Sequence, residues 1–347
     1  MNPHWNTFLL TAGARIEGDR VEDFGNPARE LQASDSGDVI ADLGHRGLIA
    51  VRGPDAGKFL QGQLTNDIDL VVEGHSQLSG YCSPKGRLLA LLRIFRRDDA
   101  LYLQLPRPLL DGTLARLKKY VLMSKVTLED AGAALIGIGL TGPHAEAILG
   151  DLIAAVPAEP DAVGRDGALT VLRLPGRRPR FALYGPPAEM ERAWTTLAAR
   201  ATPVGAAAWD RHDILAGIPD VYPATVEEFI PQTVNLELLG GINFKKGCYT
   251  GQEIVARLHY RGSVKRRMYL GHADAESVPA PGTPLHATGD DGQAVGHIVS
   301  ATPAPAGGCD LLAVVATEHS TGNNLYIKDN PEIKLTLQPP AGLPAFS

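Results

Sequence analysis

The sequence has few of the residues that build a disulfide framework or a self-contained metal site. Its 347 residues include only three cysteines, Cys82, Cys248 and Cys309. They are odd in number, far apart and outside any CxxC or Cys/His pattern that would supply four ligands. We therefore expect no metal site, and any iron–sulfur chemistry would not depend on a cluster held by this chain alone.

Long hydrophobic runs and an excess of positive charge are also missing. No stretch approaches the ~20 apolar residues of a membrane span, and the first residues lack the pattern of a secretory signal, so we expect a cytoplasmic protein with no membrane partner. Lys and Arg number 33 against 39 Asp and Glu, a formal charge of −6. No overall basic field therefore indicates nucleic acid.

What is present is an ordinary globular composition, 44% hydrophobic and 21% charged, long enough for two or three domains. Alternating apolar runs at 77–83, 87–95 and 101–105, separated by short turns, predict an antiparallel meander. Short strands punctuated by Gly, Pro and Asp after residue 268 predict a small β-barrel. With helical patterns between them, the chain reads as α+β.

We divide the sequence into four parts. The first, rich in Gly, Asp and Glu, is expected to be a loose lead-in, and two α+β lobes and the barrel follow it. The predicted bounds are 1–38, 39–130, 131–265 and 266–340.

The most unusual segment runs from Lys246 to Glu253. Gly247 and Gly251 bracket a cysteine and a tyrosine, and the Gln-Glu pair that follows is predicted to start a helix. Glycine permits positive φ or close backbone approach, so Cys248 is expected to be at least partly open to solvent. Lys245, Lys246 and the amides of the helix are the groups able to lower the pKa of its thiol. A buried structural cysteine is the alternative.

The octet Lys246-Gly247-Cys248-Tyr249-Thr250-Gly251-Gln252-Glu253 reproduces the K-G-C-Y-x-G-Q-E signature of the YgfZ family, which the chain resembles. The resemblance covers most of residues 40–330. Other matching segments are 42–67, 84–87, 229–232, Arg257, 261–262 and 265–266.

This resemblance implies a fold similar to the T-protein of the glycine cleavage system, with three domains around a central opening that accepts tetrahydrofolate. It implies a tetrahydrofolate-binding factor that assists assembly or repair of iron–sulfur enzymes, with these enzymes or their assembly machinery as partners, and that affects tRNA thiomethylation indirectly. The family's functional cysteine maps to Cys248. The accompanying candidates are Lys246, Gly247, Tyr249, Gly251, Gln252, Glu253 and Arg257, with Lys85, Arg87, Arg261 and Lys265 as secondary ones.

Two other functions remain open. A tetrahydrofolate-dependent aminomethyl or one-carbon transferase needs a carboxylate beside the folate, but Leu89 and Ala90 stand where the T-protein has its acidic pair, which leaves Glu253 as the candidate base. Glycine-cleavage activity is therefore not expected.

An RNA-binding tRNA-modification protein is the other alternative. It would use the basic run of Arg257, Arg261, Lys265, Arg266 and Arg267, in which tyrosines are interleaved. The acidic total favours a solvated linker face instead, so we expect no direct tRNA contact. Whether Cys248 serves as nucleophile, redox group or ligand is left open.

Overall fold

The computed structural model describes residues 2–288, 292–321, 325–327 and 330–343. The chain splits into two compact units. Unit 1 comprises Met1–Phe59, Asp69–Gln77 and Arg93–Asp210. Unit 2 comprises Leu60–Ile68, Leu78–Leu92 and Arg211–Ser347. Each unit is therefore assembled from three separate stretches of sequence.

Residues 3–36 form regular secondary structure, so the prediction of a loose lead-in is wrong there. They make α1 (Pro3–Thr11), the hairpin of β1 (Arg15–Glu17) and β2 (Arg20–Asp23), and α2 (Pro27–Ser36). Each helix starts with proline after an asparagine that caps its first turn. Trp5 and Leu9 of α1 are fully buried, and Trp5 Nε1 donates to Asp42 at 2.7 Å. Tertiary burial thus orders a segment whose polar composition indicated little structure.

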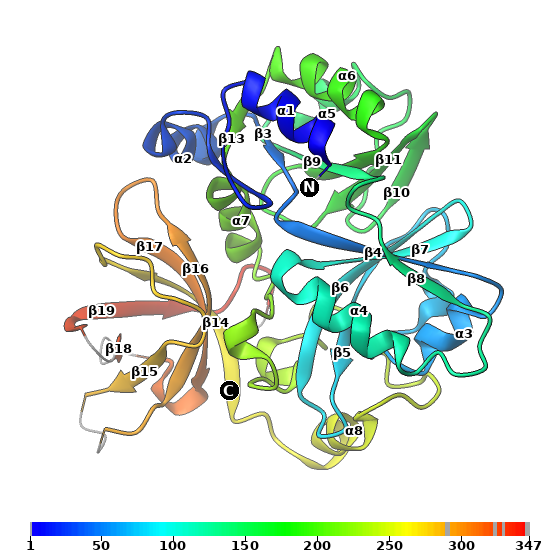
Figure 1. The fold of residues 1–347 in the computed structure, drawn as a ribbon. Helices are drawn as coiled ribbons and strands as arrows, with labels where there is room; N and C mark the ends of the chain where they lie inside the picture. The colour runs from blue at the N-terminus through cyan, green and yellow to red at the C-terminus, as the bar shows by residue number, and fades with distance from the viewer. Residues whose placement is uncertain (1, 289–291, 322–324, 328–329, 344–347) are drawn as a thin grey trace. The chain divides into compact units, whose positions relative to one another are not determined.

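The first sheet of unit 1 has six strands in the order β10-β11-β12-β9-β3-β13. Helices α1, α5 (Ala145–Leu149) and α6 (Pro187–Ala198) cover one face of it and share a core cluster with its strands (Figure 1). Burial of apolar side chains in this layer is the main force holding it together. The strand bounds are β3 Val39–Asp42, β9 Ile136–Thr141, β10 Val163–Asp166, β11 Leu169–Leu174, β12 Arg180–Gly185 and β13 Thr202–Val204.

A second sheet has the strand order β5-β6-β7-β4-β8, and the predicted meander at 77–105 is confirmed in its β5, β6 and β7. Within unit 1, Leu48 and Tyr102 of this sheet pack in one cluster with Tyr184 of the first sheet and with Trp209. The bounds are β4 Arg46–Arg52, β5 Gln77–Cys82, β6 Leu88–Arg97, β7 Ala100–Pro106, β8 Thr127–Asp130, with α3 Ala56–Gln61, η1 Ile68–Leu70, η2 Arg107–Leu109 and α4 Leu110–Lys118.

Unit 2 ends in a closed six-stranded barrel of order β14-β17-β16-β15-β18-β19, which confirms the predicted C-terminal β-barrel. Its interior is a cluster of aliphatic side chains with Tyr269 and Cys309. The strands are β14 Arg266–Ala273, β15 Pro284–Ala287, β16 Gly296–Pro303, β17 Cys309–Ala316, β18 Leu325–Ile327 and β19 Asn330–Gln338. Before the barrel come α7 Ala206–Leu215, η3 Pro223–Thr225, η4 Pro231–Val234 and α8 Gln252–Arg261, and η5 Thr317–His319 follows β17.

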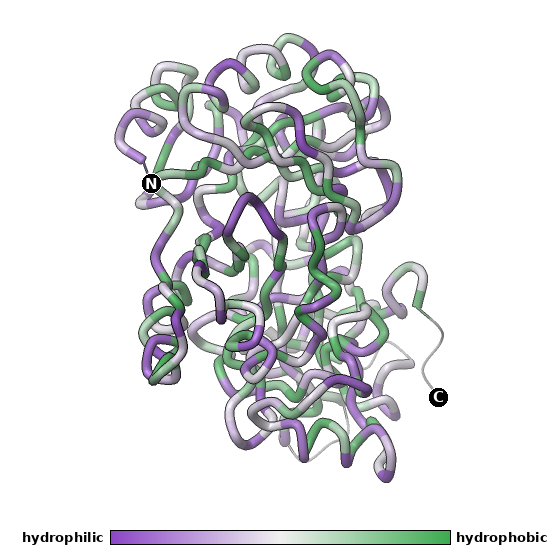
Figure 2. Tube along the Cα trace, turned by 90° about the vertical axis from the view of Figure 1, so that its right-hand side faces the viewer, coloured by the Kyte–Doolittle hydropathy of each residue, from purple (hydrophilic) through white to green (hydrophobic). Residues whose placement is uncertain are grey.

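Hydrophobic stretches along the trace are short and alternate with hydrophilic ones (Figure 2). This is the pattern of helices and strands that bury one face. Within the described ranges, none of the helices combines the length and the apolar character needed to cross a bilayer.

Candidate functional site

The signature octet forms a loop that enters α8. Gly251 caps the helix with a left-handed backbone, φ +82°, so the predicted helix start at Gln252 is confirmed. A Cβ on Gly251 would lie 2.4 Å from the Ser83 carbonyl oxygen, at the turn of the β5–β6 hairpin. A Cβ on Gly86, in the same turn, would lie 2.7 Å from Ile254 Cβ. The helix entry and the hairpin turn therefore meet at distances that only glycine allows.

The Lys246 side chain is buried, 9% exposed, and its ammonium group is held by backbone carbonyls. Nζ donates to the carbonyl oxygens of Gln61 at 2.7 Å, Leu64 at 2.6 Å and Asn66 at 3.0 Å. A buried ammonium is tolerated only when such acceptors replace water. The sequence suggests that Lys246 acts on the Cys248 thiol, but its described hydrogen bonds instead join the signature loop to the end of α3.

The segment that accepts Lys246 is itself tied to the residues before the octet. Thr65 Oγ1 donates to the Gly241 carbonyl at 2.7 Å, and Asn66 Nδ2 donates to the Gly240 carbonyl at 2.8 Å. In return, Asn243 N donates to the Thr65 carbonyl at 3.0 Å. The two segments thus interlock through buried hydrogen bonds, which restricts the conformations of the loop.

Adjacent residues of the octet point in opposite directions with respect to solvent. Cys248 is exposed, whereas Tyr249 is 8% exposed and its ring lies 5.2 Å from Lys246 Nζ. Burial raises the pKa of the Tyr249 phenol, and the neighbouring Cys82 adds to the rise. The loop therefore anchors its tyrosine inside unit 2 and leaves its cysteine accessible.

The other two cysteines are buried. Burial raises the pKa of the Cys82 thiol to about 12 and that of Cys309 to about 11, with the Asp310 carboxylate adding to the second. Both thiols are therefore protonated at neutral pH and unreactive. Cys248 is the accessible thiol among the three.

The remaining candidates differ in what they contact. Glu253, Arg257 and Arg261 are exposed on α8, and Lys265 is exposed between α8 and β14. Gly247 is exposed in the loop, and Gln252 is half-buried. At the hairpin turn Lys85 is exposed. Arg87 donates through Nη1 to the Glu227 and Glu228 carbonyls at 3.2 and 2.6 Å.

Sequence reasoning gave no role to several residues that hold this site. Thr65 and Asn66 are buried and donate to the Gly241 and Gly240 carbonyls. Gln232 is also buried, and its Nε2 donates to the Val255 carbonyl of α8 at 2.7 Å. A polar residue next to an apolar run is a weak signal for such a contact, because the partner lies far away in sequence.

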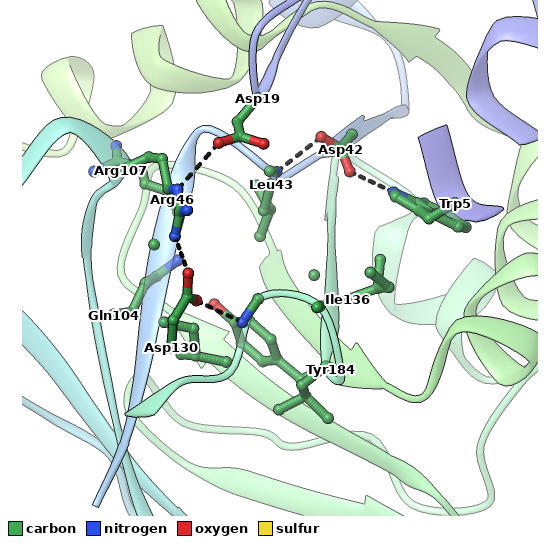
Figure 3. A pocket seen from close by; sticks show the side chains of 17 residues that line it. Trp5, Asp19, Asp42, Leu43, Arg46, Gln104, Arg107, Asp130, Ile136 and Tyr184 are labelled. Atoms are coloured by element: carbon green, nitrogen blue, oxygen red, sulfur yellow. Dashed lines mark hydrogen bonds and ion pairs between the residues drawn. The ribbon is translucent and has the colours of Figure 1, made fainter. Parts of the chain in front are cut away.

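Unit 1 contains a cavity of about 220 Å³ that none of the predicted site residues lines. Figure 3 shows Trp5 and Asp42 on one side of it and the Arg107–Asp130 pair on the other. Asp42 accepts from Trp5 Nε1 at 2.7 Å and from Gly44 N at 2.8 Å, and burial raises the pKa of its carboxyl. Across the described residues, no group of His, Cys, Asp and Glu side chains is arranged to hold a metal ion.

Comparison with known proteins defines the class of fold. Residues 18–164 match the family model of the GCVT N-terminal domain. The crystal structure of the glycine cleavage system aminomethyltransferase T from Bartonella henselae aligns with a TM-score of 0.72, at 19% identity, over 96% of this chain and 95% of that one. At that identity the likeness shows the fold alone. The predicted α+β, T-protein-like fold is confirmed.

Sequence identity is higher to a second group of proteins. The chain is 36% identical over 294 residues to the tRNA-modifying protein YgfZ of Edwardsiella ictaluri, covering 84% of this chain and 88% of that protein. It is 35% identical over 302 residues to the tRNA-modifying protein YgfZ of Yersinia pestis (strain Pestoides F), covering 87% and 91%. The chain belongs to the YgfZ family, as its octet indicated.

The carbonyl contacts of Lys246 predict a large effect on stability. Lys246→Met should leave three inward carbonyls without their donor and lower the free energy of unfolding by roughly 3 kcal/mol. Urea unfolding followed by circular dichroism measures it. Lys245→Met is the matched control, because Lys245 is exposed, and it should change the value by less than about 0.5 kcal/mol. Equal losses in the two variants would contradict a specific role for Lys246.

Exposure predicts the order in which the cysteines react. In the folded protein at about pH 7.5, iodoacetamide should modify Cys248 well before Cys82 and Cys309, whose thiols are buried with raised pKa values. Peptide mass spectrometry over time gives the three rates, and all three should become similar in denaturant. Native labelling of Cys82 or Cys309 as fast as Cys248 would contradict the burial of these two thiols.

Proposed function

We propose that this chain is a folate-binding factor in tRNA modification that acts, through the thiol of Cys248, on the assembly or repair of iron–sulfur enzymes in the cytoplasm. The observation that carries the proposal is an exposed thiol on a loop held on both sides by buried contacts. Lys246 ties the loop to the carbonyls of Gln61, Leu64 and Asn66, and Gly251 ties it to the hairpin turn.

Such a loop suits a residue that must meet another macromolecule. A reactive side chain on a mobile loop would lose conformational entropy when it engages a client, whereas a pre-ordered one does not. An exposed thiol can attack a disulfide, be oxidised and reduced again, or ligate iron for a short time. The buried Cys82 and Cys309 can do none of these at neutral pH.

Folate binding is supported by the fold, since the protein of that fold from Bartonella henselae is an aminomethyltransferase of the glycine cleavage system. The chain's own residues fit binding better than transfer. Exposed Lys85 offers a cation for the carboxylates of a folate tail. Leu89 and Ala90, which occupy the expected carboxylate positions, are buried and cannot move a proton. We therefore propose that folate is bound without aminomethyl transfer.

The alternative, a one-carbon transferase with Glu253 as base, is less well supported. Glu253 is exposed in the first turn of α8, where a carboxylate commonly stabilises the helix dipole. A general base must be held beside the proton that it moves, and an exposed carboxylate on a helix surface has no enclosing site to hold the substrate against it. An assay with lipoyl carrier protein and tetrahydrofolate would reveal transfer if Glu253 supplied it.

The proposed role of the thiol predicts a separation of function from folding. Cys248→Ala should abolish complementation of a strain that lacks its YgfZ, read out as the activity of an iron–sulfur enzyme and as tRNA thiomethylation. Because the side chain is exposed, the thermal melt should move by no more than about 1 °C. Cys309→Ala is the control for removal of a cysteine. It should lower the melting temperature, because it leaves a cavity in the core, and the protein that remains folded should keep its activity. Full complementation by Cys248→Ala would remove the thiol from the mechanism.

The folate part is tested separately by titration calorimetry of the purified protein with tetrahydrofolate. Binding should give measurable heat at sub-millimolar ligand and should persist in Cys248→Ala, since the thiol is not proposed to hold folate. Lys85→Ala should weaken it about threefold to tenfold if it meets the tail carboxylates. The absence of heat at millimolar tetrahydrofolate would exclude folate as the ligand.

A further inference from the structure

A cluster of rings lies where Phe244, two residues before the octet, packs against the C-terminal part of α8. The Phe244 and His259 rings stack with centroids 3.7 Å apart and planes 10° apart. Tyr260 meets both rings edge-on, at 6.2 and 4.7 Å, and is itself 66% exposed. Val255 is buried in α8, whereas most of the helix faces solvent. The cluster is therefore a partly exposed aromatic surface.

The sequence segment that contains these rings is rich in positively charged residues. Between Asn243 and Arg267 the chain has a single acidic residue, Glu253. Five cations of this segment are exposed: Lys245, Arg257, Arg261, Lys265 and Arg266. Among the described residues none of the five is in an ion pair, whereas Arg267 pairs with Glu237 and Lys246 is held by carbonyls. Although the whole chain has a formal charge of −6, this segment carries exposed positive charge.

We infer that this aromatic–basic face, made of Phe244, His259, Tyr260 and the five exposed cations, binds single-stranded RNA. Exposed cations attract phosphates, and each phosphate that they neutralise releases counterions. Exposed rings give unpaired bases a stacking surface that tolerates any sequence. A purely electrostatic face would need no rings, whereas this one stacks Phe244 on His259 and exposes Tyr260 beside them.

The exposed rings favour binding of single-stranded RNA over double-stranded RNA. Bases in an A-form duplex are stacked on each other and present only edges, so an aromatic side chain has no face to cover. Loops and ends of a folded RNA leave bases unpaired. The face therefore fits the single-stranded parts of an RNA such as tRNA. This inference rests on the proposed role in tRNA modification for the choice of RNA, and it replaces the indirect effect expected from the sequence with direct binding.

Fluorescence anisotropy with a labelled single-stranded RNA of about 12 nucleotides and with the matching duplex tests the inference. The single strand should bind at least several times more tightly. Tyr260→Ala should weaken single-strand binding about tenfold, while Tyr260→Phe, which keeps the ring, should retain it. The double variant Arg257→Gln, Arg261→Gln should reduce the slope of log affinity against log salt by about 1.4, because each phosphate that is no longer neutralised lowers the slope by about 0.7.

Tyr120→Ala is the matched control, because Tyr120 is an exposed tyrosine after two exposed lysines in unit 1. It should leave RNA affinity unchanged. Equal weakening in Tyr120→Ala and Tyr260→Ala, equal binding of strand and duplex, or no binding at about 50 mM salt would each overturn the inference. The folate and Cys248 roles are tested independently: Tyr260→Ala should keep its folate heat, and Cys248→Ala should keep its RNA affinity.

Discussion

The contact between the Lys246 ammonium and three backbone carbonyls is the interaction on which the rest of the signature region depends. The partners are 180 to 185 residues away in sequence, so this one side chain closes a very long loop. An ammonium has three N–H donors that can point to three separate acceptors, whereas a planar guanidinium cannot match such a cradle. The tyrosine ring at 5.2 Å completes the enclosure of the charge.

With Lys246 and Tyr249 directed inward, the geometry of the residues between them follows. Gly247 and Cys248 lie on the exposed side, and Gly251 must then adopt a left-handed backbone to press against the hairpin turn and begin α8. The octet is therefore one mechanical unit, in which two inward anchors and one close backbone approach determine where a single thiol stands. In this chain, Lys246, Tyr249 and Gly251 therefore hold the loop in place and leave Cys248 accessible.

Local patterns were predictable from the sequence, and long-range contacts were not. The meander, the barrel and the start of α8 follow from alternation, turn residues and a glycine cap, all of which act over a few neighbours. The role of Lys246 could not be predicted, because backbone carbonyls carry no sequence signal. The contacts of Arg87 could not be predicted for the same reason, since its described partners are also carbonyls. The lead-in was misjudged because Trp5 finds its core only in tertiary structure.

The discontinuous make-up of unit 2 has a consequence for how the chain emerges during synthesis. Residues 60–68 and 78–92 leave the ribosome long before Lys246 and the barrel, with which they share unit 2. At about 5 to 20 residues per second, roughly 180 residues correspond to a wait of about 10 to 40 s. During that time the carbonyls of Gln61, Leu64 and Asn66 have only water as partner, and the early segments of unit 2 cannot close around them. The early segments of unit 2 therefore complete their contacts only after residue 246 and the barrel have been synthesised.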